Sequence, residues 1–485
     1  MGHLVCEVLR GRAPEKGRVT TGWGWAMKQG TMNARIWLPL LAISMSSAVQ
    51  AATMSFGGSF RSEAASYTNL KLGALTGPIS KNFIAGRALL NPNLVVDDHF
   101  SIKSQWSLLS SPSFTPRANT GLAVGQGSYV FGDNTSASLA LSRAWLEWTS
   151  DIGVFRLGRM PVSWGYGVLY DSGESVWDDF QTTMDRIEYR LHLGYVVGAL
   201  AYSKNRKISV QDNDNDQQFF TAYLRYDNPE VEIEAGVLFE QQNRAGNQSG
   251  DLQTNNPYSQ ASTTPIGQLM PSPLSNSVVD VYFKKTAGYF SYGAEVSWLS
   301  GSSTNNTSTP GASPGLNAFG ALANAAIEYR KVKGFLEVLY ATGDSDLTDA
   351  NLTGFVLLNR NRRPGLILGR ELLGPYNGNN VALGSPVFYG ANNTFSGVLY
   401  FRPGVRFDWS KSLTSAIELI YARKVADAAS AALDLGVELD IGTEYAVYKN
   451  FRLGLDVGLL LPGGGLQQAN PTPAYAFRST ASLSF

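Results

Sequence analysis

Few residues of this 485-residue chain have the types and spacing that catalysis requires. Beyond residue 51 the only histidines are His99 and His192, and the single cysteine of the chain, Cys6, lies outside that part. A histidine could serve as a general base, but His192 alternates with Glu188 and Arg190, as residues on one face of a strand do. The sequence therefore predicts no catalytic residue and no enzyme activity.

A run of acidic residues, VQDNDNDQQ, is the best candidate for binding a metal ion. Asp212, Asp214 and Asp216 alternate in it and could offer oxygen atoms to Ca²⁺ or Mg²⁺. The run lacks the glycine and the distal glutamate that a calcium-binding EF-hand loop needs. We interpret it as a solvated loop and expect no metal and no cofactor.

Charged residues that alternate with apolar ones are the third group of residues that could serve a function. In LDLGVELDIGTEYAV, residues 433–447, acidic side chains would lie on one face of a strand and apolar side chains on the other. The same alternation elsewhere predicts two sets of inward-facing residues in a ring of strands. The basic set is Arg143, Arg156, Arg186, Arg190 and Arg225. The acidic set is Asp434, Glu438, Asp440, Glu444 and Asp456.

The composition excludes two classes of protein. The chain has 50 Gly, 10 Trp, 22 Tyr and 23 Phe, only 16% charged residues, and a mean hydropathy of −0.10. This value is too polar for a bundle of membrane helices, and outside one segment near residue 40 no apolar run approaches the ~18 residues that a spanning helix needs. No basic surplus or stripe is present, so we expect no nucleic-acid partner.

The segment near residue 40 has the pattern of a secretory signal peptide. Lys28 and Arg35 precede an apolar core, and Val49 and Ala51 are small residues at the spacing that signal peptidase accepts. We expect cleavage after Ala51, which makes residues 1–51 an N-terminal extension with a signal peptide and residues 52–485 the mature domain. The leader carries six basic and two acidic residues, so the remainder has a formal net charge of −4.

The rest of the chain reads as a series of hairpins. Each contains two alternating stretches and one short turn, and each is separated from the next by a connection rich in Asn, Ser, Gly and Pro. The longest connections are 241–276, 300–318 and 343–394. With one strand near 54–63 and one at 475–485, we count eighteen strands, with a range of 16–18. The predicted fold class is all-β.

Two motifs resemble those of a known class of protein. The chain ends in AYAFRSTASLSF, where Leu483 and the terminal Phe485 follow alternating apolar residues, and residues 155–167 read FRLGRMPVSWGYG. The first resembles the closing strand of Gram-negative outer-membrane proteins, and the second resembles the LGR…WG element of large porin-like barrels. The resemblance implies a transmembrane antiparallel up-and-down β-barrel in the bacterial outer membrane, with long extracellular loops.

The resemblance also implies partners and a function. Phe485 and Leu483 would form the signal read by the barrel-assembly machinery, lipid and lipopolysaccharide would surround the barrel, and a homotrimer is suggested because many porins are trimers. The expected function is that of a porin, which passes ions and small hydrophilic solutes by passive diffusion. The alternatives are a substrate-selective or export channel for saccharides, for which Trp106, Trp145 and Trp164 could form an aromatic track, or a plugged structural or adhesive barrel.

The connection 343–394 is unusual because it carries an apolar stretch, TGFVLLNRNRRPGLILGRELLG. Exposed apolar side chains are unfavourable, so this stretch must pack on something. We expect it to fold into the pore as a constriction, where Arg360, Arg362, Arg363 and Arg370 would face the acidic set. A subunit interface and an additional hairpin or surface subdomain remain as alternatives.

Overall fold

The structure is a computed structural model, and it describes most of the chain beyond the predicted leader. The predicted leader, residues 1–51, lies outside the described residues. The described ranges are 52–70, 79–110, 129–130, 138–178, 181–205, 217–244, 274–303, 315–343, 345, 351–355, 364–372, 395–427, 432–466 and 472–485.

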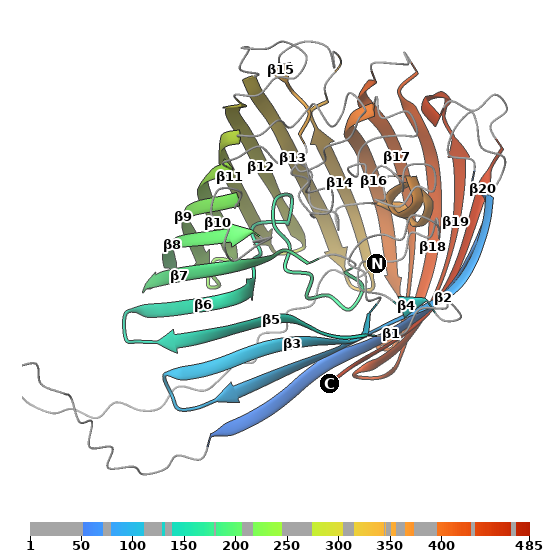
Figure 1. Ribbon diagram of the computed structural model, residues 1–485. Coiled ribbons are helices and arrows are strands. Elements are labelled where there is room, and N and C mark those ends of the chain that lie inside the picture. Colours follow the sequence, from blue (N-terminus) through green and yellow to red (C-terminus); the bar gives the residue numbers. More distant parts are fainter. Residues whose placement is uncertain are drawn as a thin grey trace, which may run out of the picture.

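Within these ranges, eighteen strands of nine or more residues form one closed antiparallel ring (Figure 1). Each pairs with its neighbours along the chain, and the first pairs with the last, which closes the barrel. The all-β barrel predicted from the sequence is therefore confirmed, with the predicted number of strands. The first half of the ring consists of β1 (Thr53–Leu70), β2 (Ile79–Val95), β3 (Phe100–Ser110), β5 (Ser138–Thr149), β6 (Gly153–Pro161), β7 (Thr183–Leu193), β8 (Val196–Asn205), β9 (Gln217–Asn228) and β10 (Ile233–Arg244). The second half consists of β11 (Leu274–Ala287), β12 (Phe290–Ser303), β13 (Gly315–Tyr329), β14 (Val332–Ala341), β16 (Phe395–Asp408), β17 (Leu413–Asp427), β18 (Asp434–Tyr448), β19 (Phe451–Pro462) and β20 (Ala474–Ser484).

Four short elements complete the described structure. The two-residue strand β4 (Tyr129–Val130) pairs with β2, and the two-residue strand β15 (Asn351–Leu352) pairs with β13. The short helices are η2 (Gly365–Leu372) and η4 (Gly464–Leu466). In the described part of the chain, no helix has the length and apolar character needed to cross a membrane.

The alternation of residue types places apolar side chains outside the ring and polar side chains inside it. On β18, Leu439 and Ile441 are 37% and 46% exposed on the outer face, whereas Glu438 and Asp440 are buried on the inner face. Such exposed apolar side chains recur on the outer face of strands all around the ring. A lipid environment would cover them, because strands in a closed barrel satisfy their own backbone hydrogen bonds.

The two ends of the barrel differ. Short turns such as those at Gly194 and Gly288, whose φ angles are +62° and +63°, lie at one end, and the longer connection that leaves β6 and returns to β7 lies at the other. Aromatic pairs lie near the turns, for example Tyr289 with Tyr329, whose ring centroids are 5.4 Å apart. An aromatic belt at one edge of the apolar surface is typical of an outer-membrane barrel.

The seam between β1 and β20 brings the C-terminal residue against a glycine. Gly58 and Phe485 exchange two backbone hydrogen bonds of 2.9 and 3.0 Å. A Cβ atom on Gly58 would lie 2.5 Å from the carbonyl oxygen of Leu89 and 2.6 Å from Cζ of Phe485. Gly58 therefore leaves the space that the terminal ring occupies when the barrel closes.

We expect Gly58→Ala to reduce the amount of folded protein in the outer membrane, because the added methyl group clashes with the closing strand. The yield of heat-modifiable barrel on a gel measures this. Gly57→Ala is the matched control, since a Cβ atom there would make only an ordinary contact, 3.5 Å from the carbonyl oxygen of Phe485. Equal yields for the two variants would contradict the role of Gly58. The proposed assembly signal itself, Phe485 with Leu483, stays a prediction.

Candidate functional site

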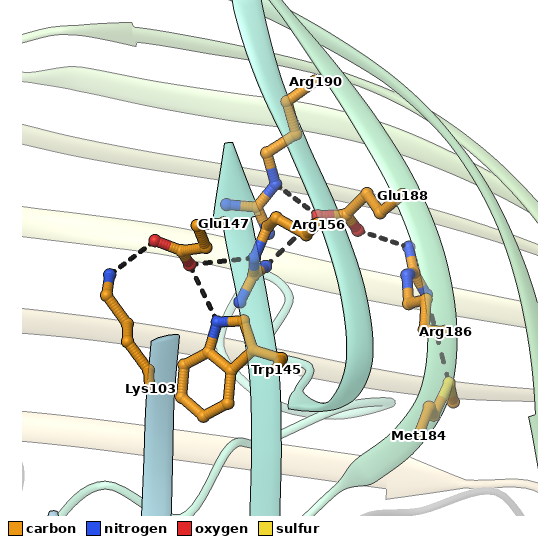
Figure 2. Close-up of polar contacts among 8 residues, drawn as sticks. All are labelled: Lys103, Trp145, Glu147, Arg156, Met184, Arg186, Glu188 and Arg190. Atoms are coloured by element: carbon orange, nitrogen blue, oxygen red, sulfur yellow. Dashed lines mark hydrogen bonds and ion pairs between the residues drawn. The ribbon is translucent and has the colours of Figure 1, made fainter. Parts of the chain in front are cut away.

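Part of the inner wall carries a continuous network of charged side chains on β3, β5, β6 and β7 (Figure 2). Glu147 forms ion pairs with Lys103 at 2.5 Å and with Arg156 at 3.1 Å. Trp145 donates its ring N–H to the same carboxylate at 2.9 Å. Arg156 continues the network to Glu188 at 3.2 Å, because the two residues are direct cross-strand partners.

Glu188 is the centre of this network. Besides Arg156, it contacts Arg186 at 2.8 Å and Arg190 at 2.5 Å, and its side chain is only 3% exposed. Three guanidinium groups thus share one carboxylate, which leaves a local excess of positive charge. The predicted basic residues Arg156, Arg186 and Arg190 are brought together here, and we call Lys103, Glu147, Arg156, Arg186, Glu188 and Arg190 the charged ladder.

The other two predicted basic residues lie apart from the ladder. Arg143 is 2% exposed and donates hydrogen bonds to the hydroxyl of Thr183 at 3.2 Å and to the carbonyl oxygen of Ser172. Arg225 lies near the turn end, paired with Asp227 at 2.7 Å. Arg143 therefore tethers the chain between β6 and β7, whereas Arg225 remains 44% exposed.

The connection from β6 to β7 folds into the ring and reaches its far wall (Figure 1). We call residues 162–178 of this connection the β6–β7 segment. Glu295 of β12 accepts hydrogen bonds from the backbone N–H groups of Tyr166, Val168 and Leu169. Gly165, with φ +52°, begins this turn, and a Cβ atom there would lie 2.5 Å from the carboxylate. Backbone N–H groups that converge in this way form an anion-binding nest.

Aromatic side chains of the β6–β7 segment strengthen the attachment. Trp164 is 5% exposed, donates its ring N–H to Asp280 at 2.7 Å, and packs edge-on against Tyr282 with ring centroids 5.0 Å apart. Tyr170 donates its hydroxyl to Glu240. Gly236 of β10 makes room for this packing, because a Cβ atom there would lie 2.8 Å from the Trp164 ring.

Arginines on the opposite side of the ring hold the other end of the β6–β7 segment. Arg61 of β1 donates to the carbonyl oxygen of Val176 at 3.0 Å, and Arg87 of β2 donates to that of Asp178. Together with Arg143 of β5, they attach the segment to three strands on one side of the ring, β1, β2 and β5. On the other side, side chains of β10, β11 and β12 contact the segment. The LGR…WG element therefore marks the point where a strand turns into an infolded loop.

A second infolded segment, residues 364–372 with helix η2, lies against β18, β19 and β20. We call it the η2 segment. Glu438 accepts the backbone N–H groups of Ile367 and Leu368, each at 2.7 Å, and Asp440 accepts that of Leu366 at 3.0 Å. Gly365, with φ +90°, again begins the turn.

The expectation that arginines of this connection face the acidic set stays a prediction. Within the described residues, backbone N–H groups of the segment contact Glu438 and Asp440. Arg360, Arg362 and Arg363 lie outside the described residues, and only the backbone of Arg370 is described. The described residues 364–372 of the apolar stretch do pack on the inner wall, since Ile367 and Leu368 are fully buried.

The remaining predicted acidic residues have separate partners. Glu444 pairs with Arg452 at 2.6 Å, and Asp456 pairs with Arg478 at 3.0 Å. Asp434 accepts the hydroxyl of Tyr421 at 2.5 Å and is exposed. A β-bulge at this point shifts the register between β17 and β18, so the simple alternation that predicted an inward Asp434 does not extend to it.

Three wall residues that anchor the β6–β7 segment were not singled out from the sequence: Glu240, Asp280 and Glu295. Alternation alone could have placed all three inside, but nothing in their strands indicates which loop would cover them. Two of the three tryptophans proposed as an aromatic track do not line the lumen. Trp164 is buried under its loop. Trp106 is the cross-strand partner of Leu141, which is exposed on the outer face, so Trp106 lies on that face too. The ring of His99 hydrogen-bonds to the carbonyl oxygen of Thr149 at 2.9 Å.

Comparison with known proteins supports the fold. No family model matches the chain, and no curated protein matches it by sequence. The crystal structure of OccK9 (OpdG) from Pseudomonas aeruginosa superposes with a TM-score of 0.51 at 11% identity, covering 89% of this chain and 99% of that one. A BenF-like porin from Pseudomonas fluorescens Pf-5 gives 0.50 at 10% identity, with coverage of 89% and 99%. The chain thus has the fold of a porin-like outer-membrane β-barrel.

Proposed function

We propose that the protein is a passive porin of the outer membrane. Ions and small hydrophilic solutes diffuse through its lumen, which the β6–β7 and η2 segments narrow. Lipid and lipopolysaccharide surround the apolar outer face, the barrel-assembly machinery inserts the chain, and a homotrimer is its proposed assembly. No step in this function requires a catalytic group.

One observation carries the proposal: charged side chains on the inner wall remain accessible to water. The side chains of Lys103, Arg190 and Arg225 point inward and keep 37%, 36% and 44% of their surface exposed. Lysine and arginine side chains are rarely found in a dry apolar interior, so their exposure inside the ring supports a hydrated lumen. A barrel of eighteen strands is also wider than its own side chains can fill.

The accessible charge favours anions over cations at the charged ladder. Glu438 and Glu295 are both 0% exposed, and each is covered by backbone N–H groups of an infolded segment. The exposed ends of the ladder are cationic, at Lys103 and Arg190. An electric field across the pore remains part of the proposal, since the charged ladder and β18 lie in different halves of the ring.

Planar-bilayer recording of the purified protein tests the proposed function. We expect steady, ohmic single-channel steps in KCl and, under a salt gradient, a reversal potential on the anion-selective side. A liposome-swelling assay should show entry of small sugars at rates that fall with solute size. A silent barrel would overturn the proposal in favour of a plugged structural protein. Current blocked by one saccharide and by no other would favour the selective saccharide channel.

A further inference from the structure

The two infolded segments are attached to the wall to different extents. Side chains from six strands hydrogen-bond to the β6–β7 segment. In the described residues, the wall side chains that hydrogen-bond to the η2 segment are Glu438 and Asp440, both on β18. We call these two residues the β18 acid pair. Loss of this one pair would remove all three of those hydrogen bonds.

The β18 acid pair is also covered by the segment that it holds. Glu438 is 0% exposed and Asp440 is 5% exposed. Oδ1 of Asp440 is buried without a hydrogen-bond partner in the described structure. The nearest described charges on adjacent strands are already paired: Glu418 of β17 with Arg402 at 2.8 Å, and Asp456 of β19 with Arg478 at 3.0 Å. Removal of the η2 segment would therefore expose two carboxylates to the lumen.

We propose that the η2 segment is a docked strap that conceals a second, cation-preferring state of the pore. While it is docked, the β18 acid pair binds backbone N–H groups and does not act on permeating ions. When it undocks, the lumen widens and the acid pair faces water as a site for cations. This inference rests on the proposed porin function and adds to it the residues that set conductance and ion preference.

Two variants break the same attachment in different ways. In Gly365→Val the added side chain clashes with the acid pair, because a Cβ atom at this position would lie 2.5 Å from Oε2 of Glu438. In the double variant Glu438→Gln, Asp440→Ala both carboxylates are lost, which weakens the hydrogen bonds from Ile367 and Leu368 and removes the one from Leu366. Both should conduct more than the original protein. Only Gly365→Val should shift the reversal potential toward cations, since only it exposes intact carboxylates.

Matched controls separate this effect from damage to the barrel. Gly194→Val places a side chain at another positive φ angle, +62°, where a Cβ atom would meet nothing within 4 Å. Asp185→Asn removes an acid on the outer face, which pairs with Arg159 instead of contacting the η2 segment. Both controls should keep the original conductance. Heat-modifiable mobility on a gel confirms that each variant has folded.

A reversible cross-link gives an independent test. A Cβ atom on Gly458 would lie 3.3 Å from Cβ of Leu366, close to the separation in a disulfide. We therefore add Gly458→Cys and Leu366→Cys to the double variant Glu438→Gln, Asp440→Ala. The only cysteine of the sequence is Cys6, in the predicted leader. The oxidised protein should conduct like the original, and a reducing agent should restore the larger conductance.

The outcomes distinguish this inference from the proposed function. If the original protein does not conduct, the porin proposal fails. If it conducts but Gly365→Val matches Gly194→Val in conductance and reversal potential, the strap inference is overturned while the porin proposal stands. A cross-linked protein whose conductance does not respond to reduction would also overturn the strap inference.

Discussion

Replacing residues 162–181 by a short Gly-Ser turn should raise the single-channel conductance several-fold. The replacement is feasible because Pro161 and Thr183 are direct cross-strand partners, so a tight turn can join β6 to β7. The barrel wall stays intact, while the segment that crosses from β5 to β12 is removed. Single-channel recording of the purified variant measures the effect. Unchanged conductance in a folded barrel would show that this segment does not narrow the pore.

A single substitution tests the same point without removing the segment. Glu295→Gln should raise the conductance by a smaller factor, because the neutral amide weakens three hydrogen bonds to backbone N–H groups. Hydrogen bonds to a charged group contribute about 1.5–3 kcal/mol each, roughly twice those of neutral pairs. Asp227→Asn is the control, since it removes an inward acid that pairs with Arg225 and is 47% exposed. It should leave the conductance unchanged.

The second large effect is expected at the centre of the charged ladder. In Glu188→Gln, Arg156, Arg186 and Arg190 lose the carboxylate that they share. The reversal potential under a KCl gradient should shift strongly toward anions. The free energy of unfolding in detergent and urea should fall by about 3 kcal/mol, because a buried charge network that loses one partner is strongly destabilised.

Asp185→Asn provides the matched control for Glu188→Gln. Asp185 lies on the same strand but on the outer face, where it pairs with Arg159 at 2.7 Å, and both side chains are about half exposed. An exposed pair contributes little stability, ~0–1 kcal/mol, and an outward charge does not meet the permeating ions. A reversal potential that moves equally in both variants would contradict the assignment of Glu188 to the pore.

The fold could be predicted because one simple rule governs every strand. Alternation with period two fixes which side chains face lipid, so the stretch 433–447 was found as β18, Asp434–Tyr448, within one residue at each end. The first strand was predicted near 54–63 but extends over Thr53–Leu70. Its second part, residues 64–70, lacks a strong alternation of polar and apolar side chains. Turn residues such as Gly194 located the hairpins.

The site could be predicted only in part, because alternation indicates a face but not what covers that face. The inward direction of Glu438 and Asp440 could be predicted, but not that backbone N–H groups of the η2 segment contact them. That arrangement depends on a loop that returns from about seventy residues away in sequence, and no local pattern encodes it. The bulge beside Asp434 was missed for a similar reason: one extra residue in a strand leaves no signal in composition.

The pairing of β1 with β20 ties folding to the end of synthesis. Ser59 and Ser484 are register partners although more than four hundred residues separate them, so the first strand keeps an unpaired edge until the last strand has been made. Such an edge invites pairing with other chains, and contacts so distant in sequence form slowly. We therefore expect the newly exported chain to depend on a periplasmic holding chaperone. Depleting such chaperones should lead to degradation of this protein before it reaches the membrane.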